Sequence, residues 1–322
     1  MNSLSQAALC VVVLAACPLA SNAALAQDAF KTFKQIDSTA KMPKLNSFSP
    51  TVGSPVPVAR DVRLDAKLTA DGQPMQTGLT WRVFSPQPGP DGKLPLVATS
   101  EGGGAQFQLV PGDYFVNVAF GRAGVTKKVT VPATGDVGKQ ALVLDAGGFV
   151  LNAVAGSDQR LPASKLRFSI YSAEVREDGE RGLVMANVKA DTIVRLNAGT
   201  YHVVSEYGDI NATVRADIQV EAGKLTEATI QHRAAQMTLK LVSQAGGEAI
   251  ADTAWSVLTA GGDVVSESVS AFTTMVLAEG DYTAVARNKD KIYQRDFTVH
   301  SGRNADVEVL MRDQQSANVD PD

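Results

Sequence analysis

One motif occurs three times in this sequence at a nearly constant spacing, and this repetition constrains the fold more than any other feature. Each occurrence has an aromatic residue on one predicted strand and a Gly-x-Tyr at the start of a later strand. The signature residues are Trp81, Gly112 and Tyr114; Phe168, Gly199 and Tyr201; and Trp255, Gly280 and Tyr282. The three aromatic residues are spaced by 87 residues, and the tyrosines by 87 and then 81. Repeats of about 20 to 50 residues indicate solenoids or propellers, whereas a unit of this length can bury its own core as an immunoglobulin-like sandwich.

The repeats predict an all-β fold, because their apolar residues alternate with polar ones and no segment has a helical period. Val62, Leu64, Ala66 and Leu68, for example, form one face of a half-buried strand. We expect three tandem immunoglobulin-like or prealbumin-like β-sandwich domains after a signal peptide and a flexible linker. The predicted segments are a signal peptide (1–26), a linker (27–57), β-sandwich repeats (58–146, 147–233 and 234–312) and a disordered tail (313–322).

The N-terminal segment indicates export. An apolar stretch, 7–16, is followed by the small-x-small pattern Ala24-Leu25-Ala26, which predicts cleavage after Ala26 and a periplasmic or secreted protein. The segment Leu14-Ala15-Ala16-Cys17 supports an alternative, in which Cys17 is acylated and the protein is an outer-membrane lipoprotein. Pro18 directly after that cysteine makes this alternative less attractive. We expect membrane contact only through such a lipid anchor.

Composition removes several classes of function. Both cysteines lie in the predicted leader, so the mature chain has no disulfide framework and no thiolate ligand. The net charge of −4 is small and evenly spread, so we expect no nucleic-acid partner. His202, His232 and His300 are isolated in the sequence, and we expect each at the surface rather than in a zinc site. We therefore predict no catalytic residue, metal or cofactor, and a hydrolase is the least favoured class.

The recurrent aromatic residues and tyrosines have a structural interpretation. A large aromatic side chain fills the space between two sheets, and an inward tyrosine at the start of a strand can hydrogen-bond back to a neighbouring loop. The segments 109–114, 196–201 and 277–282 resemble the leucine, proline-glycine and tyrosine signature of carboxypeptidase-regulatory-like and collagen-adhesin B-type domains. Residues 58–312 are also similar to tandem-repeat proteins of bacterial cell envelopes. The resemblance implies sandwich domains with an accessory or interaction role.

Some adhesin B-type domains carry an internal bond between a lysine and an Asn or Asp side chain. The nearest matching residues here, Lys240 and Asp306, alternate with apolar neighbours and are expected to point away from the core. The sequence therefore departs from the pattern that such a bond requires.

The second repeat contains the candidate interaction surface, because its tyrosine strand runs into a loop that mixes aromatic, acidic and amide groups. Its residues are His202, Glu206, Tyr207, Asp209 and Asn211, and loops on a rigid sandwich commonly carry binding. The favoured function is a non-enzymatic envelope protein with a structural or protein-interaction role. The alternative is a carbohydrate- or peptidoglycan-binding envelope protein. The expected partner is accordingly another envelope protein or a cell-wall glycan.

Overall fold

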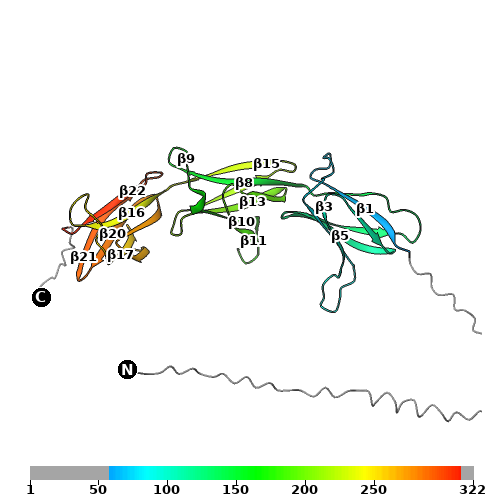
Figure 1. The fold of residues 1–322 in the computed structure, drawn as a ribbon, viewed down its shortest axis with the longest axis horizontal. Helices are drawn as coiled ribbons and strands as arrows, with labels where there is room; N and C mark the ends of the chain where they lie inside the picture. Colours follow the sequence, from blue (N-terminus) through cyan, green and yellow to red (C-terminus); the bar gives the residue numbers. More distant parts are fainter. Residues whose placement is uncertain (1–57, 313–322) are drawn as a thin grey trace, which may run out of the picture. The chain divides into compact units, whose positions relative to one another are not determined.

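The computed structural model describes residues 58–312, and this part of the chain consists almost entirely of β-strands (Figure 1). The strands form three β-sandwiches, here called sandwich 1, sandwich 2 and sandwich 3 in chain order, which confirms the all-β class. The helical structure within this range is a single 3₁₀ turn, η2 (Ala163–Lys165). No helix in residues 58–312 has the length and apolarity needed to cross a membrane. The predicted signal peptide, linker, Cys17 and tail lie outside the described residues.

The three sandwiches have matching strands. Sandwich 1 contains β1 (Arg60–Lys67), β2 (Leu79–Phe84), β3 (Leu96–Gly102), β4 (Ala105–Leu109), β5 (Gly112–Phe120), β6 (Ala123–Val131) and β7 (Gln140–Val143). Sandwich 2 contains β8 (Ala146–Ala155), β9 (Gln159–Arg160), β10 (Leu166–Val175), β11 (Arg181–Val188), β12 (Ile193–Asn197), β13 (Gly199–Tyr207), β14 (Thr213–Val220) and β15 (Leu225–His232). Sandwich 3 contains β16 (Ala234–Val242), β17 (Thr253–Thr259), β18 (Val264–Val269), β19 (Phe272–Ala278), β20 (Gly280–Asn288), β21 (Lys291–Val299) and β22 (Ala305–Leu310).

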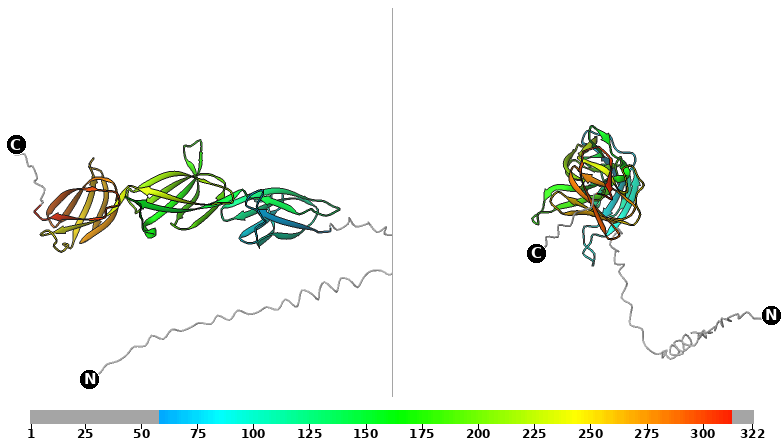
Figure 2. Two further views of the ribbon diagram at one scale, coloured as in Figure 1. Left: turned by 90° about the horizontal axis from the view of Figure 1, so that it is seen from above. Right: turned by 90° about the vertical axis from the view of Figure 1, so that its left-hand side faces the viewer.

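Each sandwich pairs a three-stranded sheet with a four-stranded sheet. In sandwich 1 the orders are β4-β1-β7 and β3-β2-β5-β6, and sandwiches 2 and 3 repeat them, with the short β9 added beside β8. The first and last main strands of each unit pair in parallel, and the remaining neighbours are antiparallel. In immunoglobulin constant domains, by contrast, strands A, B, E and D share one sheet. The sandwich architecture is therefore immunoglobulin-like, while the strand order is different. The left view of Figure 2 shows the same three groups of strands.

Each core follows from the alternation in the sequence. In β1, Val62, Leu64 and Ala66 are buried, as predicted. The aromatic residue of the second main strand lies at the centre of each core: Trp81, Phe168 and Trp255 are at most 1% exposed. Full burial of one large apolar side chain contributes about 1.5 to 3 kcal/mol to folding. Each sandwich therefore has an apolar core of its own.

Candidate interaction site

The three signature tyrosines play the same structural role. Each hydroxyl donates a hydrogen bond to the backbone carbonyl four residues earlier, which fixes the corner where the chain enters the tyrosine strand. The bonds are all 3.0 Å long and join Tyr114 to Val110, Tyr201 to Asn197, and Tyr282 to Ala278. Tyr114 and Tyr282 are less than 10% exposed. This geometry confirms the structural interpretation of the tyrosines.

The other signature residues are structural as well. Gly112, Gly199 and Gly280 have φ angles of 155°, 150° and 157°, a region that side chains with a Cβ rarely adopt. The indole N–H of Trp81 donates to a backbone carbonyl at 2.8 Å, and that of Trp255 does so at 3.1 Å. The repeated signature therefore builds the sandwiches.

Junction 1–2 is the contact between the β5–β6 hairpin tip of sandwich 1 and the end of β12 in sandwich 2. At the tip, Gly121 has a φ of 65°, and a Cβ built on it would lie 2.9 Å from the Cβ of Arg195. The backbone N–H of Arg122 donates to the Arg195 carbonyl at 3.1 Å. The guanidinium of Arg195 also lies over the ring of Phe120, 4.5 Å from its centroid. Only a glycine tip permits this close approach.

Asn197 completes junction 1–2 with its side-chain amide. Its Nδ2 donates to the carbonyls of Leu144 at 2.7 Å and Gly124 at 3.3 Å. Its Oδ1 accepts the backbone N–H of Gly124 at 3.1 Å. One side chain of sandwich 2 thus satisfies three backbone groups that precede its own sandwich.

Junction 2–3 is the corresponding contact between the β13–β14 hairpin tip and β19. Gly208 occupies the position of Gly121, 87 residues later, with a φ of 73°. A Cβ at Gly208 would lie 2.7 Å from the Cβ of Val276, which stands directly before the signature leucine as Arg195 does. The two junctions therefore share one packing arrangement.

The amide of junction 2–3 comes from the opposite partner. Asn211, in the hairpin loop of sandwich 2, accepts the backbone N–H of Ala278 at 2.9 Å and donates to the Tyr282 hydroxyl at 2.9 Å. Ala278 stands in the signature position that Asn197 occupies in sandwich 2. The third hairpin tip differs again: the residue aligned with the two glycines is Lys289, at a φ of 54°.

The structure separates the five residues of the predicted interaction surface. His202 Nδ1 lies 2.7 Å from the Asp217 carboxylate, and Glu206 is partly buried. Tyr207 is 2% exposed and lies in the core of sandwich 2, so its inclusion in a surface is wrong. The cause is its place in β13, where alternation turns Val203, Ser205 and Tyr207 inward.

The two loop residues of that prediction lie near junction 2–3. Asp209 is exposed and forms an ion pair with Arg167, whereas Asn211 is occupied by its bonds to sandwich 3. A contiguous patch formed by all five residues does not exist in this structure. The binding role predicted for the remaining residues stays a prediction.

His232 corrects another expectation, because it is fully buried at the end of β15 and not at the surface. Its Nε2 lies 2.7 Å from the Ser205 hydroxyl, and its Nδ1 has no hydrogen-bond partner among the described residues. Burial lowers the pKa of His232 from its usual value near 6.5 to about 4. The alternation of β15, which turns Ile230 inward, also turns His232 inward.

Two further clusters were considered from the sequence. Lys240 forms an ion pair with Asp306 at 2.8 Å on the outer face of β16 and β22, and its side chain is partly exposed. Both side chains therefore point away from the core, as predicted. Within residues 58–312, no group of three or more His, Cys, Asp or Glu side chains could hold a metal ion.

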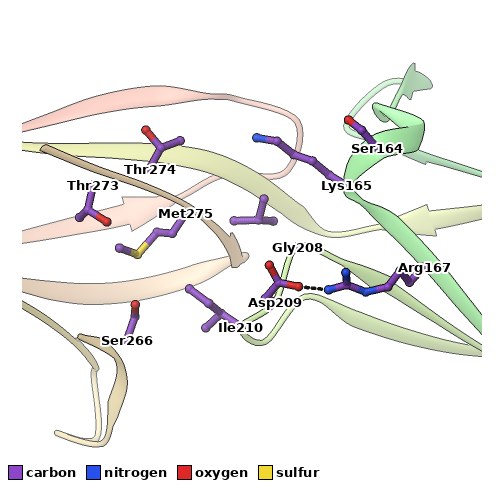
Figure 3. Close-up of a pocket in the computed structure, with 11 residues that line it drawn as sticks. Ser164, Lys165, Arg167, Gly208, Asp209, Ile210, Ser266, Thr273, Thr274 and Met275 are labelled. Carbon is purple, nitrogen blue, oxygen red and sulfur yellow. Dashed lines mark ion pairs between the residues drawn. The ribbon is translucent and has the colours of Figure 1, made fainter. Parts of the chain in front are cut away.

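A cleft of about 330 Å³ lies at junction 2–3, beside the Gly208 loop (Figure 3). Lys165 and Arg167 of sandwich 2 line one side, and Thr274 and Val276 of β19 line the other. The Lys165 ammonium donates to the Gln236 side-chain carbonyl. No sequence pattern predicts this cleft, because its residues come from four separate segments. The recurrence of Gly121 and Gly208 at the repeat spacing could have pointed to the junction.

A known family model matches the third sandwich. Residues 236–311 match the Rhizobiales growth-associated tandem repeat domain, and this range coincides closely with β16 to β22. The match supports the tandem-repeat prediction for this part of the chain. A search of curated protein sequences found no match.

Several solved structures match this chain at low identity. The Bacillus anthracis TIE protein is 17% identical over 80% of this chain with a TM-score of 0.23, and this chain spans only about half (51%) of that protein. A streptococcal ancillary pilin is 12% identical, with 78% of this chain and 98% of the pilin covered and a TM-score of 0.29. BcpA, the major pilin subunit of Bacillus cereus, is 11% identical, with coverages of 78% and 99% and a TM-score of 0.22. At these scores the likeness carries no inference about function.

Proposed function

We propose that this protein is an exported, non-enzymatic component of the bacterial cell envelope, whose three sandwiches serve as a spacer and a protein-interaction scaffold. The observation that carries this proposal is the shared construction of the two junctions. In both, a glycine hairpin tip packs on the strand end of the next sandwich, and an asparagine amide bonds across the contact. In repeat proteins, each unit is stabilised by its contacts with the neighbouring units.

The recurrent polar side chains of the described residues have structural roles. The signature tyrosines and indoles bond to the backbone, and the buried histidine faces a serine inside a core. An enzyme needs a cleft where several titratable groups converge on a substrate. The chemistry seen in residues 58–312 instead supports holding and spacing.

Export is part of the proposal and rests on the leader pattern that ends at Ala26. Fractionation of cells expressing the full chain tests it: mature protein in the periplasm or medium is expected. A Cys17→Ser variant that leaves processing and fractionation unchanged would argue against the lipoprotein route. Retention of the uncleaved chain in the cytoplasm would contradict export itself.

The partner is tested by in-cell crosslinking of the tagged mature protein, followed by mass spectrometry and a sugar assay on the same eluate. We expect a discrete protein partner that is absent from a leader-swapped control retained in the cytoplasm. Enrichment of cell-wall sugars without a protein partner would contradict the proposed scaffold function and favour glycan binding.

A further inference from the structure

A second cleft lies at junction 1–2, and apolar side chains line it. It has a volume of about 180 Å³ and lies against the outer face of the sheet β12-β8-β15. Its lining includes Leu68 and Phe120 of sandwich 1 and Ile193 and Leu225 of sandwich 2. Ile193 is 48% exposed and Leu225 is 52% exposed, so the cleft is open to solvent.

A glycine forms part of the floor of this cleft. Gly148 of β8 lies between Arg195 of β12 and Leu225 of β15 in the register of the sheet. A Cβ on Gly148 would lie 3.4 Å from Cδ1 of Leu225, so a side chain there would enter the cleft. In sandwich 3 the residue opposite Val276, at the place of Gly148, is Gln236. The corresponding position at junction 2–3 is therefore polar.

The volume of the apolar cleft matches one side chain. Sites for drug-sized ligands have about 300 to 1,000 Å³, whereas an apolar cavity of about 150 Å³ holds a single benzene molecule. The cleft of about 180 Å³ accordingly accommodates one aliphatic or aromatic side chain. Burial of such a side chain is favourable in proportion to the apolar area that it removes from water. The cleft thus fits a side chain that another protein surface presents.

Arg195 adds a positive charge at the rim of the cleft. Its guanidinium lies over the ring of Phe120, 4.5 Å from the centroid. Stacking uses the face of the guanidinium and leaves the N–H groups at its edge, which bind a carboxylate through two parallel hydrogen bonds. Within residues 58–312, Arg195 forms no ion pair, whereas Lys224 on the same rim pairs with Glu221. The cleft therefore favours an apolar side chain with a carboxylate beside it.

The β10–β11 hairpin of this same chain has the complementary chemistry. Residues 173–180 are all exposed, so the hairpin, here called the arm (residues 173–183), extends beyond the core of sandwich 2. The arm presents two exposed aliphatic side chains, Val175 at 55% and Leu183 at 58%. Its four carboxylates belong to Glu174, Glu177, Asp178 and Glu180. None of these carboxylates forms an ion pair among the described residues.

The arm and the cleft of one chain lie on opposite sheets of sandwich 2. The arm continues β10 and β11 of the four-stranded sheet, whereas the cleft lies against the outer face of β12-β8-β15. Figure 1 shows the β10–β11 hairpin on the side of sandwich 2 away from β8 and β15. The arm therefore cannot enter the cleft of its own chain, and its side chains are available to a second copy.

We infer that this chain associates with a second copy of itself: the arm of one copy places Val175 or Leu183 in the apolar cleft of the next and pairs an arm carboxylate with the Arg195 guanidinium beside that cleft. The inference goes beyond the proposed scaffold function, because it concerns contacts between copies and holds whichever partner the scaffold binds. The contact joins two different surfaces, and such heterologous contacts form rings or open filaments. The opposite charges of the two surfaces favour this pairing and make it sensitive to salt.

Sedimentation velocity of the predicted mature chain, residues 27–322, tests the inference over a range of protein and salt concentrations. We expect association that grows with protein concentration and weakens at high salt, because salt screens the attraction between the arm and Arg195. A chain that stays monomeric up to about 1 mM would overturn the inference.

Two double variants each remove one side of the contact. The cleft variant, Arg195→Met with Leu225→Ser, loses a charge-assisted hydrogen bond and apolar area, and its association constant should fall at least about tenfold. The arm variant, Val175→Ser with Leu183→Ser, loses apolar area, and we expect a fall of at least about tenfold here too. Unchanged association of either variant would place the contact elsewhere and contradict the inference.

A matched control comes from sandwich 1, whose β2–β3 hairpin corresponds to the arm. Leu94 is 38% exposed and Leu96 is 55% exposed there. Leu94→Ser with Leu96→Ser should leave self-association unchanged, and an equal loss in this control would show that the effect is not specific to the arm. The side chains replaced in the control and in both test variants are exposed, so thermal unfolding should change little.

A mixture of the cleft variant and the arm variant tests the direction of the contact. The cleft variant keeps its arm and the arm variant keeps its cleft, so an equimolar mixture should form a dimer through one arm–cleft contact and nothing longer. Absence of this dimer would show that the two surfaces do not bind each other.

The in-cell crosslinking experiment distinguishes a different occupant of the cleft. If the chain stays monomeric and another protein is captured that the cleft variant loses, the cleft binds that protein and the self-association is overturned. If both variants lose self-association while capture of the partner is unchanged, the inference stands independently of the scaffold function.

Discussion

Junction 1–2 and junction 2–3 use the same hairpin tip and the same strand end, but the amide that joins them comes from opposite sides. At junction 1–2, Asn197 reaches back from sandwich 2 to three backbone groups. At junction 2–3, Asn211 reaches forward from sandwich 2 to Ala278 and Tyr282. The packing is thus set by the glycine tip, while the polar bonds are interchangeable. The comparison predicts that the glycines matter more than the amides.

The largest effect is expected from Gly208→Ala, which adds a Cβ 2.7 Å from the Cβ of Val276 at a φ of 73°. The strained backbone and the clash together should cost about 3 kcal/mol in the free energy of unfolding. Gly179→Ala is the control, because Gly179 has a φ of 83° with nothing within 4 Å of its Cβ position. The control should lose about 1 kcal/mol. Equal losses in urea titrations would mean that the junction tolerates a side chain at its tip.

The next effect is a difference in the pH dependence of stability. Leu144 in sandwich 1 occupies the buried position that His232 occupies in sandwich 2, and only the histidine can take up a proton. The pKa of folded His232 is about 4, below its usual 6.5, so only the unfolded chain takes up the proton as the pH falls between these values. Stability should therefore fall by about 2 kcal/mol between pH 7.5 and pH 5.

His232→Leu introduces the leucine that sandwich 1 has at this position, and it should remove the loss of stability between pH 7.5 and pH 5. Glu279, whose pKa is lowered chiefly by its hydrogen bond from Arg233, loses its contribution at more acidic pH and is common to both proteins. Unfolding titrations of the two proteins at pH 7.5 and pH 5 give the comparison. Parallel pH profiles would show that His232 does not control this stability.

A smaller effect compares the amides themselves. Asn197→Ala removes three hydrogen bonds and should cost about 2 kcal/mol, whereas Asn211→Ala removes two and should cost about 1 kcal/mol. Thermal unfolding of each variant measures the difference. A larger loss for Asn211→Ala would reverse the ranking of the junctions.

The smallest effects are expected at three polar side chains that lie outside the cores of the sandwiches. His202→Ala, Glu206→Ala and Asp209→Ala should each change stability by about 0.5 kcal/mol or less, since exposed ion pairs contribute little. Thermal unfolding provides the measurement, with Asn211→Ala as the more damaging reference. A loss comparable with that reference would assign these side chains a structural role.

The sequence predicted the sandwich units because their alternation and their recurring Trp and Gly-x-Tyr are local patterns. Parallel pairing of β1 with β7 joins the two ends of a unit, and no local pattern records which distant strands meet. Tyr207 and His232 were misplaced because polar or amphipathic side chains were assigned to the surface by type. Their burial follows from the alternation of side chains between the two faces of a strand, which also places Ser205 in the core.

The junctions were missed for a related reason. Each depends on a glycine, an amide and a strand end from different repeats, and their meeting is a property of the fold. Lys165 gave no signal in the sequence, since its environment is made by η2, Gln236 and β19.

Lys289 distinguishes the third hairpin tip from the two glycine tips. It occupies the tip position that is glycine at junction 1–2 and at junction 2–3, and it also adopts a positive φ. In the geometry of the two existing junctions, its side chain would occupy the space of the next strand end. We expect a fourth sandwich fused after the third to remain uncoupled unless Lys289 is replaced by glycine.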